Sequence, residues 1–137
     1  MTEASLHSDG IHADTIYVDL DGTLCPIKRE GEHYADLPVN APLVARLRSA
    51  RERGYRIVVY TARNVRTYAG DMAHLTAVTA PAVLAWLERN AVPYDGLIVG
   101  KPWPGPRGFY VDDKAVRPDE FINMSDAEIQ ALIGNAQ

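Results

Sequence analysis

Four short apolar runs, each followed by a polar residue of a type used in catalysis, constrain the fold of this chain more than any other feature. The runs lie at about Thr15–Asp19, Tyr55–Thr61, Leu97–Gly100 and Phe109–Asp112, and helical segments lie between the first three. Strands that alternate with helices pair in parallel through right-handed crossovers. The sequence therefore predicts an α/β fold: a Rossmann-like, three-layer parallel sheet with helices on both faces.

The expected helices have recognisable ends. One helix near Pro42–Arg53 follows Asn40, a residue type that caps helices, and Gly54 ends it. A second helix is expected near Pro81–Asn90. A last helix begins at Ser125, where the pattern Ser-x-x-Glu forms a capping box.

The end of the first run carries two carboxylates. Asp19 and Asp21 are separated by one residue, so on a strand they point into the same small volume, and Gly22 and Thr23 follow directly. Two like charges held this close repel unless a cation lies between them or one carboxylate takes up a proton. The motif therefore predicts a metal-assisted phosphate site, although Asp-Gly after an apolar run is also typical of a simple hairpin turn.

The other three runs also end in chemically useful residues. Thr61, Lys101 and the pair Asp112–Asp113 follow them. Open parallel sheets bind ligands at the carboxyl ends of their strands. Taken singly, the threonine could be an ordinary strand residue, the lysine a solvated charge and the acid pair a solvated turn. Their joint placement favours a site.

The order of these residues resembles the four motifs of the haloacid dehalogenase-like superfamily, whose members are mostly phosphatases with an aspartyl nucleophile. Neither the Asp21–Thr61 gap nor the Thr61–Lys101 gap leaves room for the cap domain that many members carry. Further segments make the chain similar to the small capless phosphatases of capsule and cell-surface polysaccharide biosynthesis. These segments are Arg63–Tyr68, Val92–Asp95, Gly100–Trp103, Gly108–Lys114 and Arg117–Phe121.

This resemblance implies a role for each motif residue. Asp19 would be the nucleophile that forms an aspartyl-phosphate, and Asp21 would be the general acid and then the general base. Thr61 and Lys101 would bind the phosphoryl group. The implied cofactor is Mg²⁺, and its implied ligands are Asp19, Asp21 through its backbone carbonyl, Asp112 and Asp113.

Substrate choice in a capless enzyme is expected to come from loops, and Arg63–Thr79 is long for a strand-to-helix connection. Arg63 and Arg66 could bind a second anionic group, and Tyr68 and Trp103 could contact a sugar ring. The alternative is solvated arginines and packed aromatic rings. The candidate substrate-binding residues are Gly22, Ala62, Arg63, Asn64, Arg66, Tyr68 and Trp103.

Composition limits the partners. The net charge of −4 provides no broad cationic field for nucleic acid, and no apolar run approaches the ~20 residues that span a membrane. Met1–Asp14 is polar and lacks the features of an export signal, so we expect a flexible tail, a single catalytic domain over residues 15–137 and a cytoplasmic protein. The single cysteine, Cys25, is expected to be a reduced thiol without a catalytic role.

The leading hypothesis is thus a Mg²⁺-dependent phosphomonoesterase acting on a small sugar phosphate, with a homo-oligomer as one way to enclose the open site. Phosphatases of phosphoproteins or nucleic-acid ends are the alternative within the same class. A phospho-accepting receiver or binding module is the alternative from another class. In receivers, however, the metal-binding acid pair precedes the phosphorylated aspartate, the reverse of the order in this chain.

Overall fold

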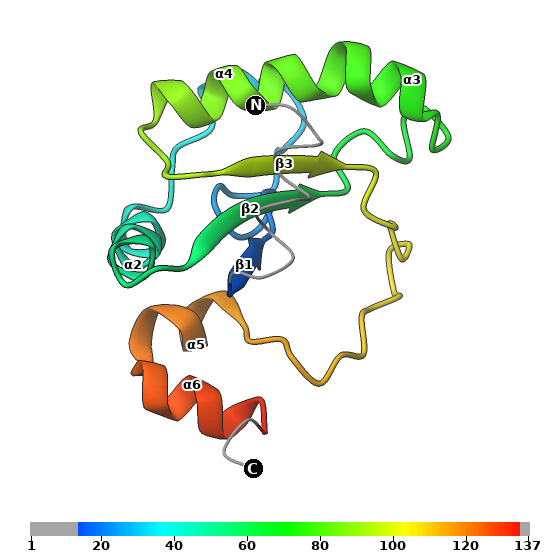
Figure 1. Cartoon of the computed structure of the whole chain (residues 1–137). Coiled ribbons are helices and arrows are strands. Elements are labelled where there is room, and N and C mark those ends of the chain that lie inside the picture. Colours follow the sequence, from blue (N-terminus) through cyan, green and yellow to red (C-terminus); the bar gives the residue numbers. More distant parts are fainter. Residues whose placement is uncertain (1–13, 135–137) are drawn as a thin grey trace. The chain divides into compact units, whose positions relative to one another are not determined.

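The computed structural model describes residues 14–134, so the predicted tail lies almost wholly outside the described residues. The chain divides into two compact units, one that ends at Trp103 and one that begins at Pro104. The sheet and the longer helices belong to the first unit (Figure 1). In chain order the elements are β1 (Thr15–Val18), the 3-10 turn η1 (Tyr34–Asp36), α2 (Ala41–Glu52), β2 (Arg56–Thr61), α3 (Met72–His74), the π-helical turn η2 (Leu75–Thr79), α4 (Ala80–Arg89), β3 (Gly96–Val99), α5 (Pro118–Asn123) and α6 (Asp126–Leu132).

The sheet has three strands in the order β1-β2-β3, and both pairs are parallel. Val18 of β1 lies opposite Val59 of β2, and Thr61 of β2 lies opposite Val99 of β3. This register places the carboxyl ends of all three strands at one edge of the sheet. The predicted α/β class, the first three strands and their parallel pairing are confirmed.

The core of the first unit is built around β2. Ile57, Val58 and Val59 are consecutive and all buried, so both faces of this strand are covered, as is typical of a central parallel strand. The helix α2 packs against β2, and α4 runs along β3 (Figure 1). Buried residues of the two helices complete the core; they are Leu43, Val44, Leu47 and Ala50 of α2, and Val83, Trp86 and Leu87 of α4.

The ends of α2 follow the sequence prediction. The Asn40 side chain accepts a hydrogen bond from the Leu43 N–H, as a helix cap does. Gly54 follows the helix with φ of +102°, a conformation that glycine adopts without strain. The two residue types that mark a helix start and stop thus act here as expected.

The helical segment before β3 is longer than predicted. Helical turns begin at Met72, where the Asp71 side chain accepts hydrogen bonds from Ala73 and His74 N–H groups, and continue to the end of α4. The prediction started this helix at Pro81, which is instead an interior residue. Proline has no N–H to donate to the preceding turn, and the wider π turn η2 lies directly before it. The long loop expected over residues 63–79 therefore ends at Asp71.

The segment between β1 and α2 is anchored to α4. The Trp86 Nε1–H donates to the Leu37 carbonyl at 2.9 Å, and the Arg89 guanidinium donates to the Ala35 carbonyl at 3.0 Å. These bonds cross about fifty positions of sequence and involve the buried indole of α4. They fix the short turn η1, and with it Tyr34.

The second unit contains one confirmed and one wrong prediction. The last helix, α6, has the predicted capping box: Glu128 N–H donates to Ser125 Oγ, and Ser125 N–H donates to a Glu128 oxygen. The strand predicted at Phe109–Asp112 is wrong, since the described residues form no strand there. Its aromatic and β-branched residues satisfied the pattern of a strand, but Val111 is 91% exposed, so it does not bury the surface that stabilises one.

The helix α5, in the same unit, was not predicted. It begins at Pro118. The Arg117 N–H donates to the Glu120 carboxylate at 2.7 Å, in the same way that the Ser125 N–H donates to Glu128 at the start of α6. Proline at the first helical position followed by two acidic residues is a helix-start signal. The sequence therefore contained enough information to find this helix.

Candidate functional site at the carboxyl ends of the strands

The structure brings together candidates that follow three different strands. Lys101 Nζ lies 3.7 Å from Asp19 Oδ1, and the Lys101 N–H donates to the Thr61 carbonyl at 3.1 Å. Asp19 follows β1, Thr61 ends β2 and Lys101 follows β3. Parallel pairing alone places these three positions at one edge of the sheet. Lys101 therefore links the residues expected to be the nucleophile and the phosphoryl-binding hydroxyl.

Asp19 is the accessible carboxylate of this cluster. Its side chain is 36% exposed, and Thr23 Oγ1 donates to Asp19 Oδ2 at 3.4 Å. Partial burial raises the pKa of Asp19 above its ordinary value, and the charge of Asp21 acts in the same direction. The ammonium of Lys101 and the Leu20 N–H partly offset this rise. A carboxylate of this kind has one oxygen beside a cation and remains open to solvent.

The tight loop after β1 sets the direction of both aspartates. The Leu20 carbonyl accepts N–H groups from Thr23, Leu24 and Cys25, so the chain curls back within five residues. Gly22 turns with φ of +86°, where a side chain would be strained, and its N–H donates to the Cys25 carbonyl. Leu20 and Leu24 are fully buried and fasten the loop to the core. Gly22, a candidate substrate-binding residue, thus has a clear backbone role.

Arg63 occupies a position that sequence reasoning did not foresee. Its side chain is only 3% exposed, and its guanidinium donates to both carboxylate oxygens of Asp21, from Nε at 3.1 Å and from Nη2 at 2.7 Å. The face of the Tyr34 ring lies over it, with the guanidinium carbon 4.0 Å from the ring centroid. Arg63 was expected to bind a substrate anion from a loop, whereas the structure directs it into the protein.

Tyr34 and Cys25 complete the surroundings of this ion pair. The Cys25 sulfur lies 3.5 Å from Asp21 Oδ1 and 3.7 Å from Arg63 Nη2. Burial, followed by the negative charge of Asp21, raises the pKa of the Cys25 thiol from 9.0 to about 12. Burial likewise raises the pKa of the Tyr34 hydroxyl. The raised pKa keeps the thiol protonated near neutral pH, and the absence of a catalytic role for Cys25 stays a prediction. Tyr34 was missed, because a single aromatic residue in a polar segment gives no sequence signal.

The Thr61 hydroxyl is also held by Arg63. Thr61 is fully buried, and its Oγ1 accepts a hydrogen bond from the Arg63 N–H at 3.0 Å. A hydroxyl that accepts a bond from one side can still donate its proton to another oxygen. The backbone of Arg63 therefore orients Thr61, while its side chain orients Asp21.

The other candidate substrate-binding residues make contacts within the protein. Asn64, with φ of +63°, accepts a hydrogen bond from the buried Thr79 hydroxyl at 2.8 Å. The rings of Tyr68 and His74 stack 4.4 Å apart. Arg66 lies over the Trp103 ring, at 5.2 Å from its centroid. Ala62 contributes its carbonyl, which accepts the Val65 N–H.

Asp112 and Asp113 belong to the second unit and are exposed. Asp112 Oδ1 accepts the Lys114 N–H at 2.9 Å, a local turn contact. Within residues 14–134, no three His, Cys, Asp or Glu side chains come together in a way that could hold a metal ion. The implied role of these two aspartates stays a prediction.

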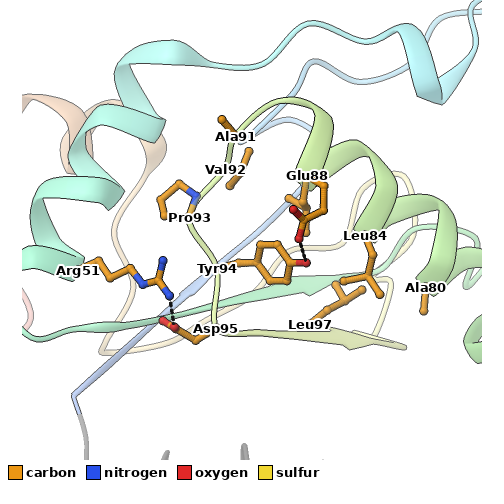
Figure 2. Close-up of a pocket in the computed structure, with 11 residues that line it drawn as sticks. Arg51, Ala80, Leu84, Glu88, Ala91, Val92, Pro93, Tyr94, Asp95 and Leu97 are labelled. Atoms are coloured by element: carbon orange, nitrogen blue, oxygen red, sulfur yellow. Dashed lines mark hydrogen bonds and ion pairs between the residues drawn. The ribbon is translucent and has the colours of Figure 1, made fainter. Parts of the chain in front are cut away.

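A separate pocket of about 560 Å³ lies near the opposite ends of β2 and β3, between α4 and the segment that leads into β3 (Figure 2). Its polar groups are paired with one another: Arg51 Nη2 donates to Asp95 at 2.6 Å, and the Tyr94 hydroxyl donates to Glu88 at 2.7 Å. None of the predicted site residues lines it. The pocket therefore does not coincide with the strand-end cluster.

A solved structure from Vibrio cholerae, a structural-genomics target, is similar to this chain over almost its whole length. The identity is 40%, the TM-score is 0.84, and the match covers 90% of this chain and 99% of the other. The two chains belong to one family. The high TM-score shows that the two chains share one fold.

Two structures of the Pnkp1/Rnl/Hen1 RNA repair complex also match, far more weakly. Identity is 18% in both cases, and the TM-scores are 0.47 and 0.45. The matches cover 82% and 87% of this chain but only 35% and 32% of the other chains. Similarity at this level carries no functional argument.

Other comparisons give no match. No family model matches the sequence, and no curated protein is similar to it at a significant level. None of the helices in residues 14–134 combines the length and apolar character needed to span a membrane.

Proposed function

We propose that this protein is a phosphomonoester hydrolase of the haloacid dehalogenase-like type that acts through an aspartyl-phosphate on Asp19. The observation that supports this most directly is the pairing of Asp19, a part-exposed carboxylate, with Lys101 at 3.7 Å, two residues before the fixed carboxylate of Asp21. A nucleophile, a cation and a second acid at one sheet edge are what phosphoryl transfer through a covalent intermediate requires.

The reaction would proceed in two displacements. In the first, Asp21 starts in its protonated form; an Asp19 oxygen attacks phosphorus, the bond to the leaving oxygen breaks, and that oxygen takes the proton from Asp21. In the second, Asp21 takes a proton from water, the water oxygen attacks phosphorus, and the bond to Asp19 breaks. Inorganic phosphate leaves, and both carboxyl groups return to their starting states.

Lys101 and Thr61 would serve the phosphoryl group. A carboxylate that approaches a phosphate dianion brings three negative charges together, and the Lys101 ammonium offsets one of them. The Thr61 hydroxyl, which already accepts the Arg63 N–H, has its proton available for a phosphoryl oxygen. The backbone bond between Lys101 and Thr61 keeps these two groups in register.

The remaining negative charge is the reason to propose Mg²⁺ as the cofactor. Carboxylate and carbonyl oxygens are the ligands that Mg²⁺ prefers, and Asp19 and the Asp21 carbonyl are of this type. Within the described residues these donors do not form a complete set, since no three His, Cys, Asp or Glu side chains come together in a way that could hold the ion. The proposal is that Asp112 and Asp113 supply the missing oxygens.

For the substrate we propose a small sugar phosphate, as the resemblance to surface-polysaccharide phosphatases implies. Arg66 and Trp103 support a specific binding surface, since the Arg66 guanidinium lies over the Trp103 ring and the contact brings a charge next to an aromatic side chain. Arg66→Ala should raise KM for a sugar phosphate more than for a small aryl phosphate. Equal effects on both substrates would exclude a role of Arg66 in recognising the sugar.

The proposal is tested by phosphate release from a panel of sugar phosphates, nucleotides, phosphopeptides and 4-nitrophenyl phosphate, with Mg²⁺ and with EDTA. We expect steady release that EDTA stops and Mg²⁺ restores. Insensitivity to EDTA would remove the metal from the proposal. Mass spectrometry of the peptide that contains Asp19 should show a transient phosphoryl group. A phosphoryl group that persists without turnover would instead indicate a receiver.

A further inference from the structure

The ion pair between Arg63 and Asp21 is the best-defined polar contact near the strand ends. Its two hydrogen bonds run from one planar guanidinium to both oxygens of one carboxylate, at 3.1 and 2.7 Å. A bidentate arrangement of this kind fixes the plane as well as the position of a carboxylate. Arg63 is also 42 positions away from Asp21 in sequence, so the contact depends on the tertiary fold.

We propose that Arg63 is a positioning residue, which holds the Asp21 carboxylate in the orientation needed for proton transfer and is itself held by Tyr34. This inference rests on the proposed function, because Asp21 needs a fixed orientation only if it exchanges protons with the leaving group and with water. Each carboxyl oxygen has two acceptor positions, so Asp21 can carry a proton while the guanidinium stays in place.

Burial explains why Arg63 can hold a carboxylate rigidly. Its side chain is 3% exposed, and the Tyr34 ring covers one face of the guanidinium at 4.0 Å. Tyr34 lies in the η1 turn, which Trp86 and Arg89 fasten to α4. A path of packed contacts therefore runs from α4 through η1 and the guanidinium to Asp21.

The backbone of Arg63 extends the same role to a second residue. Its N–H donates to Thr61 Oγ1 at 3.0 Å, so one residue orients both the acid and the phosphoryl-binding hydroxyl. A displacement of Arg63 should disturb both groups together. Displacements of about 1 Å in such groups can cost on the order of 100-fold in rate.

Direct substrate binding by Arg63 is the competing explanation, and the geometry argues against it. A guanidinium that binds a substrate anion must face solvent with donors unused, whereas Nε–H and Nη2–H of Arg63 are directed at Asp21. The two explanations differ in kinetics. Loss of a positioning residue lowers kcat for every ester, and loss of a binding residue raises KM for esters that carry a second anion.

The test compares Arg63→Ala, Arg63→Lys and the control Arg51→Ala in the full chain, with 4-nitrophenyl phosphate and Mg²⁺. Arg51 forms an Arg–Asp pair with Asp95, in the pocket of Figure 2, with a side chain that is 47% exposed. Arg63→Ala should lower kcat by about 10- to 100-fold and change KM by less than about twofold. Arg63→Lys, which keeps the charge but loses the planar fork, should fall between Arg63→Ala and wild type. Arg51→Ala should match wild type.

Chemical rescue of kcat distinguishes a positioning role from a purely structural one, because added guanidinium ion would not restore activity lost through a change in the fold. Guanidinium ion added at low concentration can enter the space vacated in Arg63→Ala and donate to Asp21. We expect several-fold recovery of kcat in Arg63→Ala and none in Arg51→Ala. If circular dichroism shows that Arg63→Ala does not fold, Tyr34→Ala replaces it in the test. This variant removes the ring that covers the guanidinium but keeps the guanidinium itself. It should lower kcat with little change in KM.

The outcomes separate the inference from the proposed function. Wild-type protein that releases no phosphate from any ester of the panel would overturn the proposed function, and this inference with it. Active wild type together with an unchanged kcat in the Arg63 variants would overturn the inference alone. A raised KM with unchanged kcat would assign Arg63 to substrate binding and would also overturn the positioning role.

Discussion

Two arginine–aspartate pairs of the first unit lie at opposite ends of its parallel strands, and they differ in almost every physical property. Arg63 and Asp21 meet at the carboxyl ends through two hydrogen bonds, with side chains that are 3% and 25% exposed. Arg51 and Asp95 meet at the amino ends, where the arginine is 47% exposed and donates a single bond at 2.6 Å. The same two residue types are thus used in a buried and in a solvated setting.

The difference shows what each pair does for the molecule. Asp95 also accepts the Ile57 N–H and donates its own N–H to the Ile57 carbonyl, so it closes the start of two neighbouring strands. An exposed pair of this kind is screened by water and contributes little by itself. Asp21 has no such task in the sheet. Its carboxylate is held beside Asp19, where a fixed acid is chemically useful and a solvated one would be mobile.

Replacement of the nucleophile should give the largest difference in kcat between variants at the carboxyl ends and variants at the amino ends of the strands. Asp19→Asn removes the oxygen that attacks phosphorus, so kcat should fall by about 1,000-fold or more. Asp95→Asn, the matched change at the amino ends, should leave kcat within about twofold of wild type. Phosphate release from 4-nitrophenyl phosphate measures both. Substantial activity in Asp19→Asn would mean that another group attacks phosphorus.

Removal of the arginine should also affect the stability of the protein differently at the two ends of the strands. Arg63→Ala leaves the Asp21 carboxylate largely buried without its partner, and we expect a loss of about 2 to 3 kcal/mol in the free energy of unfolding. Arg51→Ala should cost less than about 1 kcal/mol, because its pair is exposed to solvent. Urea unfolding followed by circular dichroism measures both values. Equal losses would show that the difference in burial has no energetic consequence.

Replacement of the acid should affect one step more than the other. Asp21→Asn keeps a side-chain oxygen for Arg63 but cannot accept a proton from water, so breakdown of the phosphoenzyme should slow by about 100-fold. The phosphoryl group should then accumulate on Asp19, where rapid quench and mass spectrometry can detect it. Normal breakdown in this variant would contradict the role of Asp21 and remove the reason for holding it.

Much of this arrangement follows from local sequence patterns. Three strands, the Asn40 cap and the Ser125 capping box were predicted because each depends on neighbouring residues alone. The convergence of Asp19 and Lys101 was also predictable, since parallel strands end at a common edge. Where a prediction needed only strand ends or helix caps, the structure agrees with it.

The errors have other origins. Arg63 was assigned to a substrate loop because sequence cannot show that a guanidinium turns inward toward a carboxylate and lies under Tyr34. Pro81 looked like a helix start, although the helix accommodates it through a π turn. The run Phe109–Asp112 had strand composition but forms no strand. The Arg63 case was decided by contacts between segments distant in sequence, the Pro81 case by a π turn next to it, and the Phe109–Asp112 case by the exposure of its side chains.

A further difference between the two ends is expected at alkaline pH, where the Tyr94 hydroxyl and the Cys25 thiol resist ionisation. Burial, followed by the hydrogen bond to Glu88, raises the pKa of Tyr94 from 10.0 to about 12, and burial raises that of Cys25 from 9.0 to about 12. Between the ordinary and the raised values, the folded protein keeps a proton that the unfolded chain releases. The stability that these two groups contribute is therefore complete below the ordinary values and is lost as pH rises toward about 12.

Urea unfolding across this range can separate the two ends of the sheet. Tyr94→Phe should flatten the loss of stability only above pH 10.0, the ordinary value of that hydroxyl, whereas Cys25→Ala should flatten it from pH 9.0 upward. The slope should therefore change first in the cysteine variant, because its thiol begins to ionise in the unfolded chain at the lower pH. Identical pH profiles for wild type and both variants would show that neither proton is retained on folding, and the two ends would then not differ in this respect.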